Sequence, residues 1–96
     1  MAKPPDLDKA FEAALGQVQR SLNRGLRTKG GASADPELRR LQTELEMQRA
    51  QAARTGVVDR TWFQHTLRWI DKWLPETEIM LIAVLGRIAR SAAPPV

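Results

Sequence analysis

Residues 79–89 read Ile79-Met80-Leu81-Ile82-Ala83-Val84-Leu85-Gly86-Arg87-Ile88-Ala89, which is the most apolar stretch of the chain. An α-helix turns about 100° per residue, so the aliphatic side chains of this stretch cover well over half of the helix circumference. The unbroken apolar run, 79–85, is far shorter than the ~20 residues needed to span a bilayer. The stretch must therefore pack against other helices, either of the same chain or of a second copy.

Around this stretch, apolar residues recur at spacings of three and four, which is the pattern of amphipathic helices. Residues 28–34, rich in Gly and small polar side chains, are typical of a flexible linker, and residues 92–96 of a frayed tail. We therefore predict a single domain, residues 1–96, with an all-α fold: a small four-helix bundle or a closely related helical array, with antiparallel helices. The helices are expected at about 6–25, 36–54, 60–74 and 76–91.

The junctions between these segments carry signals for helix ends. Asp35 followed by Pro36 predicts an N-cap and a first helical residue, because Pro needs no amide partner there. Gly56 is suited to the left-handed position that ends a helix, and Asp59 to the cap of the next one. So short a connection predicts that the second and third helices are neighbours. The apolar fourth helix is expected at the centre and the polar second helix outermost.

Composition restricts the class of protein. The chain of 96 residues has no Cys, which excludes a disulfide framework, a thiolate zinc site and a cysteine nucleophile. The N-terminal residues have no apolar segment typical of a secretory signal. We expect a soluble, intracellular protein in the cytoplasm, without a transmembrane segment.

Catalytic and metal-binding patterns are not found in this sequence. His65 is the one histidine, and the residues one helical turn away from it are Thr61, Trp62, Arg68 and Trp69, which are neither carboxylates nor a second imidazole. A histidine in such surroundings is typical of a surface side chain rather than a metal ligand or a general base. We therefore predict that the protein is not an enzyme, and we expect no metal and no cofactor.

The tryptophans are the strongest functional signal in the sequence. Trp62, Trp69 and Trp73 form one strip on the third helix, and Arg68 and Lys72 lie beside it. Tryptophan next to arginine is typical of the residues that dominate protein interfaces. The same pattern also suits an anionic membrane surface or stacking on bases, and the simplest alternative is that the indoles only complete the core.

A basic segment offers the alternative function. The net charge is +4, and Arg20, Arg24, Arg27 and Lys29 follow one another without an intervening acid. Cations on a helix that leads into a loop can neutralise phosphates, so this segment is a candidate nucleic-acid surface. A solvated helix end, where cations are favoured in any case, explains the same residues more simply.

Taken together, these patterns predict a non-enzymatic helical module for protein–protein interaction or oligomerisation, such as an adaptor or accessory protein. The expected partner is a second copy, another protein, or both. Nucleic acid binding through the basic segment is the alternative, and attachment to a membrane surface is less favoured.

Overall fold

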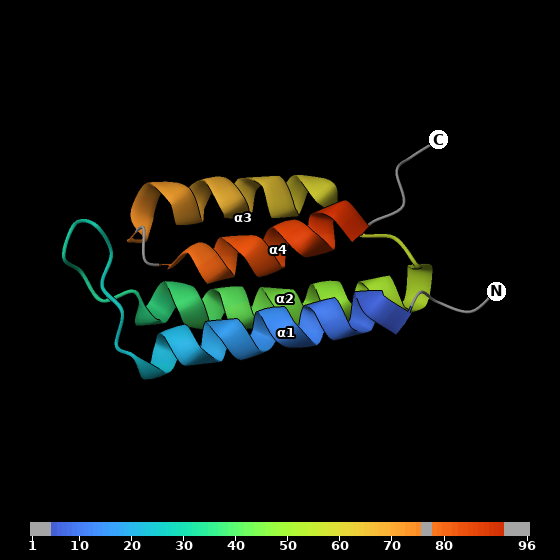
Figure 1. Cartoon of the computed structure of the whole chain (residues 1–96), viewed down its shortest axis with the longest axis horizontal. Coiled ribbons are helices and arrows are strands. Elements are labelled where there is room, and N and C mark those ends of the chain that lie inside the picture. The colour runs from blue at the N-terminus through green and yellow to red at the C-terminus, as the bar shows by residue number, and fades with distance from the viewer. Residues whose placement is uncertain (1–4, 76–77, 92–96) are drawn as a thin grey trace.

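The computed structural model describes residues 5–75 and 78–91, which form four α-helices. Each helix runs antiparallel to the one before it, as Figure 1 shows. The predicted all-α, antiparallel four-helix bundle is therefore confirmed. Residues 76–77, where the last helix was expected to begin, and the tail 92–96 lie outside the described residues. The helices are α1 (Pro5–Asn23), α2 (Asp35–Thr55), α3 (Arg60–Trp73) and α4 (Ile79–Ser91).

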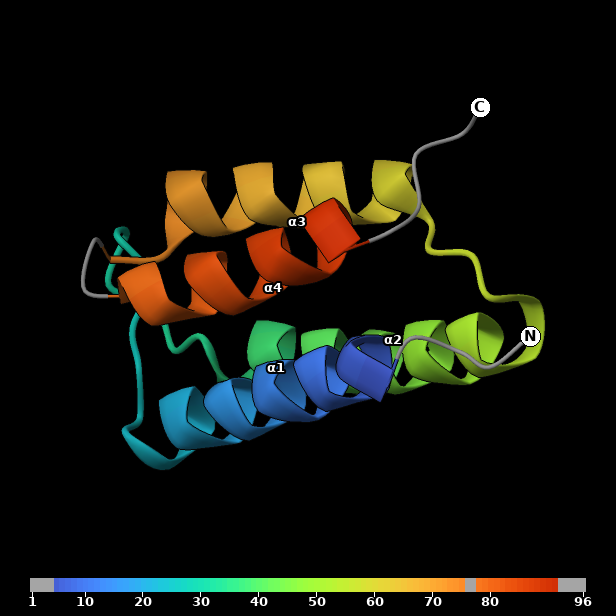
Figure 2. The same cartoon turned by 45° about the vertical axis from the view of Figure 1, so that its right-hand side comes forward.

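The bundle has two layers, one formed by α1 and α2 and the other by α3 and α4 (Figure 2). The closest packing joins α1 with α2, α1 with α4, and α3 with α4. The last helix, expected at the centre, thus lies between α1 and α3, and α2, expected outermost, has one close neighbour, but α1 also has two close neighbours. Small residues explain this, since Ala10, Ala14 and Ser21 are buried on α1 and let neighbouring helices come near its backbone.

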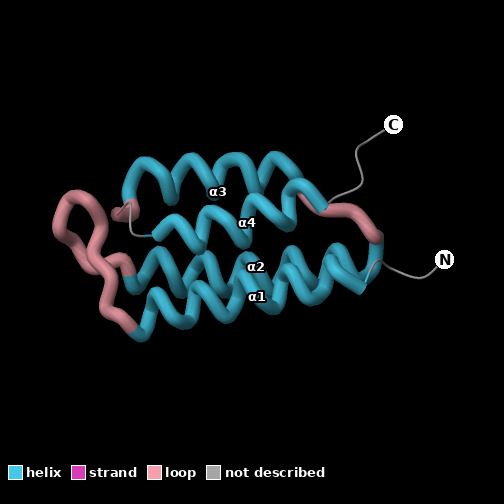
Figure 3. The backbone as a smooth tube through the Cα atoms, viewed as in Figure 1, coloured by secondary structure: helices cyan, strands magenta, loops and turns pink. Residues whose placement is uncertain are grey.

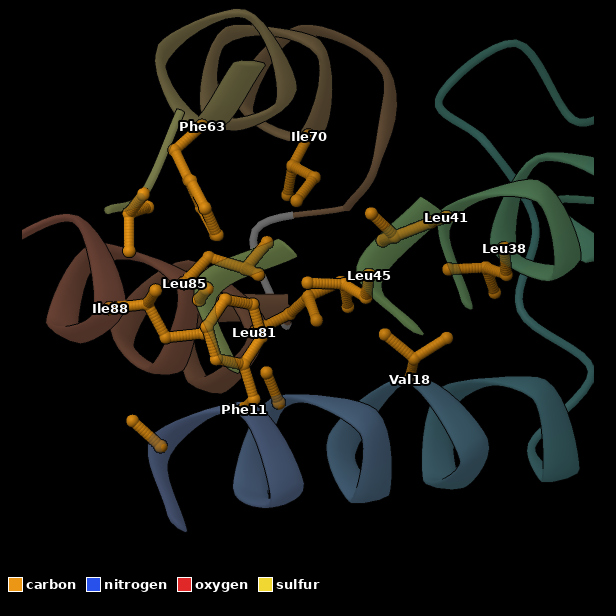
Figure 4. Packing of buried hydrophobic residues seen from close by; sticks show 14 of the residues in the cluster. Phe11, Val18, Leu38, Leu41, Leu45, Phe63, Ile70, Leu81, Leu85 and Ile88 are labelled. Atoms are coloured by element: carbon orange, nitrogen blue, oxygen red, sulfur yellow. The ribbon is translucent and has the colours of Figure 1, made fainter. Parts of the chain in front are cut away.

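All four helices contribute side chains to one core, shown in Figure 4. The ring of Phe11 on α1 meets the ring of Phe63 on α3 edge-on, with the ring centres 6.0 Å apart. Leu81 and Leu85 of α4 are completely buried between the two layers. The apolar stretch that predicts the fold therefore supplies the inner face of α4. The buried residues labelled in Figure 4 are Phe11, Val18, Leu38, Leu41, Leu45, Phe63, Ile70, Leu81, Leu85 and Ile88.

The capping residues predicted from the sequence are found between α2 and α3, but the start of α2 differs from the prediction. Gly56 has a φ of 73° and donates its N–H to the carbonyl oxygen of Ala52, and Asp59 accepts the N–H of Trp62. Asp35, however, is the first residue of α2 and not its N-cap. The N-cap position belongs to Ala34, which is buried and donates its N–H to Leu26 across the loop. The residue at the N-cap is thus held by a backbone hydrogen bond within the loop, and no side chain caps α2.

The loop between α1 and α2, drawn in pink at the left of Figure 3, is closed by hydrogen bonds, although its composition predicts flexibility. Arg27 and Ser33 form an isolated antiparallel bridge. Lys29 extends to the end of α3, where its N–H bonds the carbonyl oxygen of Trp73 and its Nζ bonds that of Asp71, at 2.7 and 2.8 Å. A cation is favoured there because the last carbonyls of a helix carry partial negative charge. The loop thus connects the two layers.

On the surface of the bundle, an ion pair joins α1 and α2. The guanidinium of Arg49 donates two hydrogen bonds to the carboxylate of Asp8, at 2.8 and 2.9 Å. Hydrogen bonding to Asp8 raises the pKa of Arg49 above its ordinary value, so the arginine stays charged. The pair is largely exposed to solvent and therefore adds little to stability.

Candidate functional site

The open side of the bundle lies between α2 and α3. These helices were expected to be close neighbours because residues 56–59 connect them, but they do not form one of the close helix pairs. The connection instead crosses from one layer to the other, as the yellow-green segment of Figure 2 shows. A groove with a volume of about 360 Å³ remains along this side, within the usual range for ligand sites.

One wall of the groove is largely charged, and the other carries two indoles and polar groups. The α2 wall is formed by Glu37, Arg40, Leu41 and Glu44. The α3 wall is formed by Trp62, His65, Thr66 and Trp69. We call these eight residues the α2–α3 groove.

Trp62 is fixed in position from two directions. Its Nε1 donates a hydrogen bond of 2.9 Å to Oε1 of Glu44 across the groove. Its ring lies edge-on to the buried ring of Phe63, with the ring centres 4.8 Å apart. An indole that is packed on the core and hydrogen-bonded at its polar edge loses little further freedom when a ligand binds, which favours binding.

Glu44 connects the two walls of the groove. Its second oxygen, Oε2, accepts a hydrogen bond of 3.0 Å from Nε of Arg40, one turn earlier on α2. The side chain of Glu44 is 36% exposed, and that of Arg40 is mostly exposed. Water and ions therefore screen this pair, and it stabilises the fold only weakly.

The five residues predicted as a protein-interaction site do not form one surface. Trp62 and Trp69 line the α2–α3 groove, both half-buried against the core. Trp73 lies outside it, is 45% exposed, and has Nζ of Lys72 5.5 Å from its ring centre. Arg68 is exposed and does not line the groove. Two tryptophans of the strip, Trp62 and Trp69, thus belong to the groove, whereas Trp73 lies exposed at the end of α3.

Sequence analysis missed the α2 wall of the groove. Arg40 and Glu44 stand one helical turn apart and are easily interpreted as a surface ion pair only. What connects Glu44 to Trp62 is a contact between residues 18 positions apart, which depends on how α2 and α3 are placed. The one local signal was the narrow apolar line of α2, which leaves Glu37 and Glu44 beside Leu41.

The basic segment proposed for nucleic acid is engaged in contacts within the chain. Nη2 of Arg24 lies 2.6 and 2.7 Å from the two carboxylate oxygens of Glu78, a side chain that is completely buried. Arg27 donates to the carbonyl oxygen of Gly31, and Lys29 to that of Asp71. Arg20 donates a longer hydrogen bond of 3.3 Å to Gln17. These cations support the fold of the loop and the start of α4.

Two further functions find no support in the described residues. Although Glu37, Glu44 and His65 all line the groove, residues 5–75 and 78–91 contain no group of three or more acidic, histidine or cysteine side chains placed to hold a metal ion. None of the helices described here is both long and apolar enough to cross a membrane.

No family model, curated protein or solved structure matches this chain. Its function therefore has to be inferred from its own residues and their geometry.

Proposed function

We propose that this chain is a non-enzymatic protein-interaction module that assembles with a second copy of itself through the outward side of α4. The observation that carries the proposal is the exposure of Ile79 and Met80, at 67% and 57%, on the most apolar helix of the chain. Ala83 is exposed one turn later. We call Ile79, Met80 and Ala83 the α4 outer face. Half-buried Ile82 and Val84 border it on either side.

The apolar residues of the α4 outer face are adjacent, whereas the other large exposed apolar residues are separated in the chain. Met47 lies on α2, Val57 in the following connection and Trp73 at the end of α3. Isolated apolar side chains are normal on protein surfaces, but a continuous apolar patch is typical of an interface. The proposal therefore uses α4 and not Met47.

The charges on α4 favour pairing with an antiparallel second copy. Arg87 and Arg90 are exposed in the last turns of α4, and the helix carries no acid. In an antiparallel pair, the arginines of the two copies lie at opposite ends, whereas a parallel pair would bring them together. The small side chain of Ala83 lets two helices approach closely.

Nucleic acid binding receives less support as the alternative. A phosphate would compete with the carboxylate of Glu78 for Arg24 and with backbone carbonyls for Arg27 and Lys29. A cation that already neutralises a buried carboxylate is costly to withdraw from the fold. Self-association through the α4 outer face leaves these contacts of the arginines and the lysine unchanged.

Light scattering coupled to gel filtration at micromolar concentration tests the proposal. We expect a mass of twice 10.8 kDa for the wild-type chain and of 10.8 kDa for the double variant Ile79→Lys, Met80→Lys. The reason is that, in an antiparallel pair, the start of α4 in one copy lies beside Arg87 and Arg90 of the other, so the added ammonium groups would meet like charges and be buried without partners.

Met47→Lys is the matched control, because Met47 is 66% exposed, much as Met80 is, but lies on α2. It should leave the mass unchanged. A monomeric wild type, or a Met47→Lys variant that dissociates as the double variant does, would contradict the proposal.

A further inference from the structure

The α2–α3 groove has a charge opposite to that of the chain. Its carboxylates, Glu37 and Glu44, outnumber its one permanent cation, Arg40, whereas the chain as a whole carries a net charge of +4. An acidic groove on a basic protein selects cationic ligands, because the rest of the surface repels them. The charge of the groove thus indicates the class of its ligand.

The two carboxylates are not equally engaged. Glu44 already accepts hydrogen bonds from Trp62 and Arg40, one on each oxygen. Glu37 is exposed and makes no hydrogen bond or ion pair with any residue that the structure describes. Glu37 is therefore the carboxylate available to a ligand, and Glu44 is the one that positions an indole.

The tryptophans supply the second half of a cation site. Trp62 and Trp69 line the groove on α3, and an indole attracts a cation that lies over its face. This chain already contains such a contact, since Nζ of Lys72 lies 5.5 Å from the centre of the Trp73 ring. A site that contains both an indole and a carboxylate favours a planar guanidinium over an ammonium group. The guanidinium can stack on the indole and, at the same time, donate two parallel hydrogen bonds to the carboxylate.

We propose that the α2–α3 groove binds an arginine side chain presented by a peptide segment of another protein. The guanidinium pairs with Glu37 and stacks on the groove indoles. The groove volume of about 360 Å³ accommodates one long side chain with part of its backbone. No residue of α4 lines the groove, so this site is separate from the self-association proposed above.

The indole N–H resonances of the three tryptophans, followed by NMR, test this inference with the full chain. The probe is a capped Gly-Arg-Gly peptide, and its control is the same peptide with citrulline, which keeps the shape and lacks the charge. We expect the arginine peptide to shift the resonances of Trp62 and Trp69 but not that of Trp73. The citrulline peptide should bind about tenfold more weakly, because its hydrogen bonds to a carboxylate are not charge-assisted.

Two glutamates on α2 provide the matched variants. Glu37→Gln should weaken binding of the arginine peptide several-fold, somewhat less than citrulline does, because the guanidinium can still lie over the indoles. Glu46→Gln should leave it unchanged, because Glu46 is also exposed on α2 but does not line the groove. Equal binding of the two peptides, or equal loss in the two variants, would overturn the proposal.

Other occupants of the groove would give different results. A Gly-Glu-Gly peptide that shifts the groove indoles as strongly as the arginine peptide would show that Arg40 and His65 determine the ligand. Shifts of the same resonances on diluting the protein alone would show that a second copy occupies the groove. Both results contradict the proposal. The variant Ile79→Lys, Met80→Lys should still bind the arginine peptide fully, which separates this test from that of self-association.

Discussion

A glutamate links two helices on the closed side of the bundle, between α1 and α4, and another does so on the open side, between α2 and α3. Glu78, just before α4, accepts hydrogen bonds from Ser21 of α1 and from Arg24, the residue after α1, and is completely buried. Glu44 of α2 accepts from Trp62 of α3 and from Arg40, and its side chain is 36% exposed. The chemistry of the two acceptors is the same, but their surroundings differ.

Burial decides what each glutamate does. In the low-dielectric interior, a carboxylate must keep its cation and its hydrogen bonds, because losing one partner is expensive. In a solvated groove, the same interactions are weak and are exchanged for others at little cost. The closed side is therefore expected to support the fold, and the open side to be available for a ligand. Three predictions test this comparison, in order of expected effect.

The largest effect is expected on the buried face of α3, which is packed into the core. Ile70 is 1% exposed, so Ile70→Ala should lower the free energy of unfolding by about 3 kcal/mol, through lost apolar burial and the cavity that remains. The neighbouring Trp69 lines the groove, and Trp69→Ala should keep the helix content and cost about half as much. Urea unfolding followed by circular dichroism measures both. If Trp69→Ala unfolds the chain as severely as Ile70→Ala, the groove indole is part of the core and the comparison fails.

An intermediate effect is expected from Arg24→Ala. Removal of the guanidinium takes the cationic partner away from the buried carboxylate of Glu78, so we expect a loss of about 2–3 kcal/mol, somewhat less than for a fully buried pair because Arg24 is half exposed.

The control for this variant is the double variant Arg24→Ala, Glu78→Gln, in which the buried charge is also removed. It should be more stable than Arg24→Ala alone, as measured by thermal and urea unfolding. If the second change gives no such recovery, the loss does not come from the buried charge.

The smallest effects are expected at the open side. Trp62→Phe keeps most of the aromatic area and removes the Nε1 donor to Glu44, so it should cost about 1 kcal/mol. Arg40→Ala breaks an exposed ion pair and should cost about 0.5 kcal/mol or less. The same urea titrations measure these differences. A Trp62→Phe variant as unstable as Arg24→Ala would mean that both sides of the bundle support the fold equally.

Much of the fold can be predicted from the sequence, because its signals are local. The spacing of apolar residues predicts four helices, and it separates Ile70 on the core side of α3 from Trp69 beside it. The ends at Gly56 and Asp59 depend on contacts within one turn, so they too can be inferred from neighbouring residues. The groove tryptophans were found in the same way.

Only the tertiary structure decided how these helices meet and which surface stays open. Arg24 and Glu78 are 54 residues apart, Lys29 and Asp71 are 42 apart, and Trp62 and Glu44 are 18 apart, so no local pattern links them. The start of α2 at Asp35, with Ala34 at the N-cap position and no side-chain cap, also differs from what the local sequence predicts. The physical reason is the range of the interactions. Periodicity and capping act within one or two helical turns, whereas the burial of a charge and the width of a groove depend on how whole helices pack.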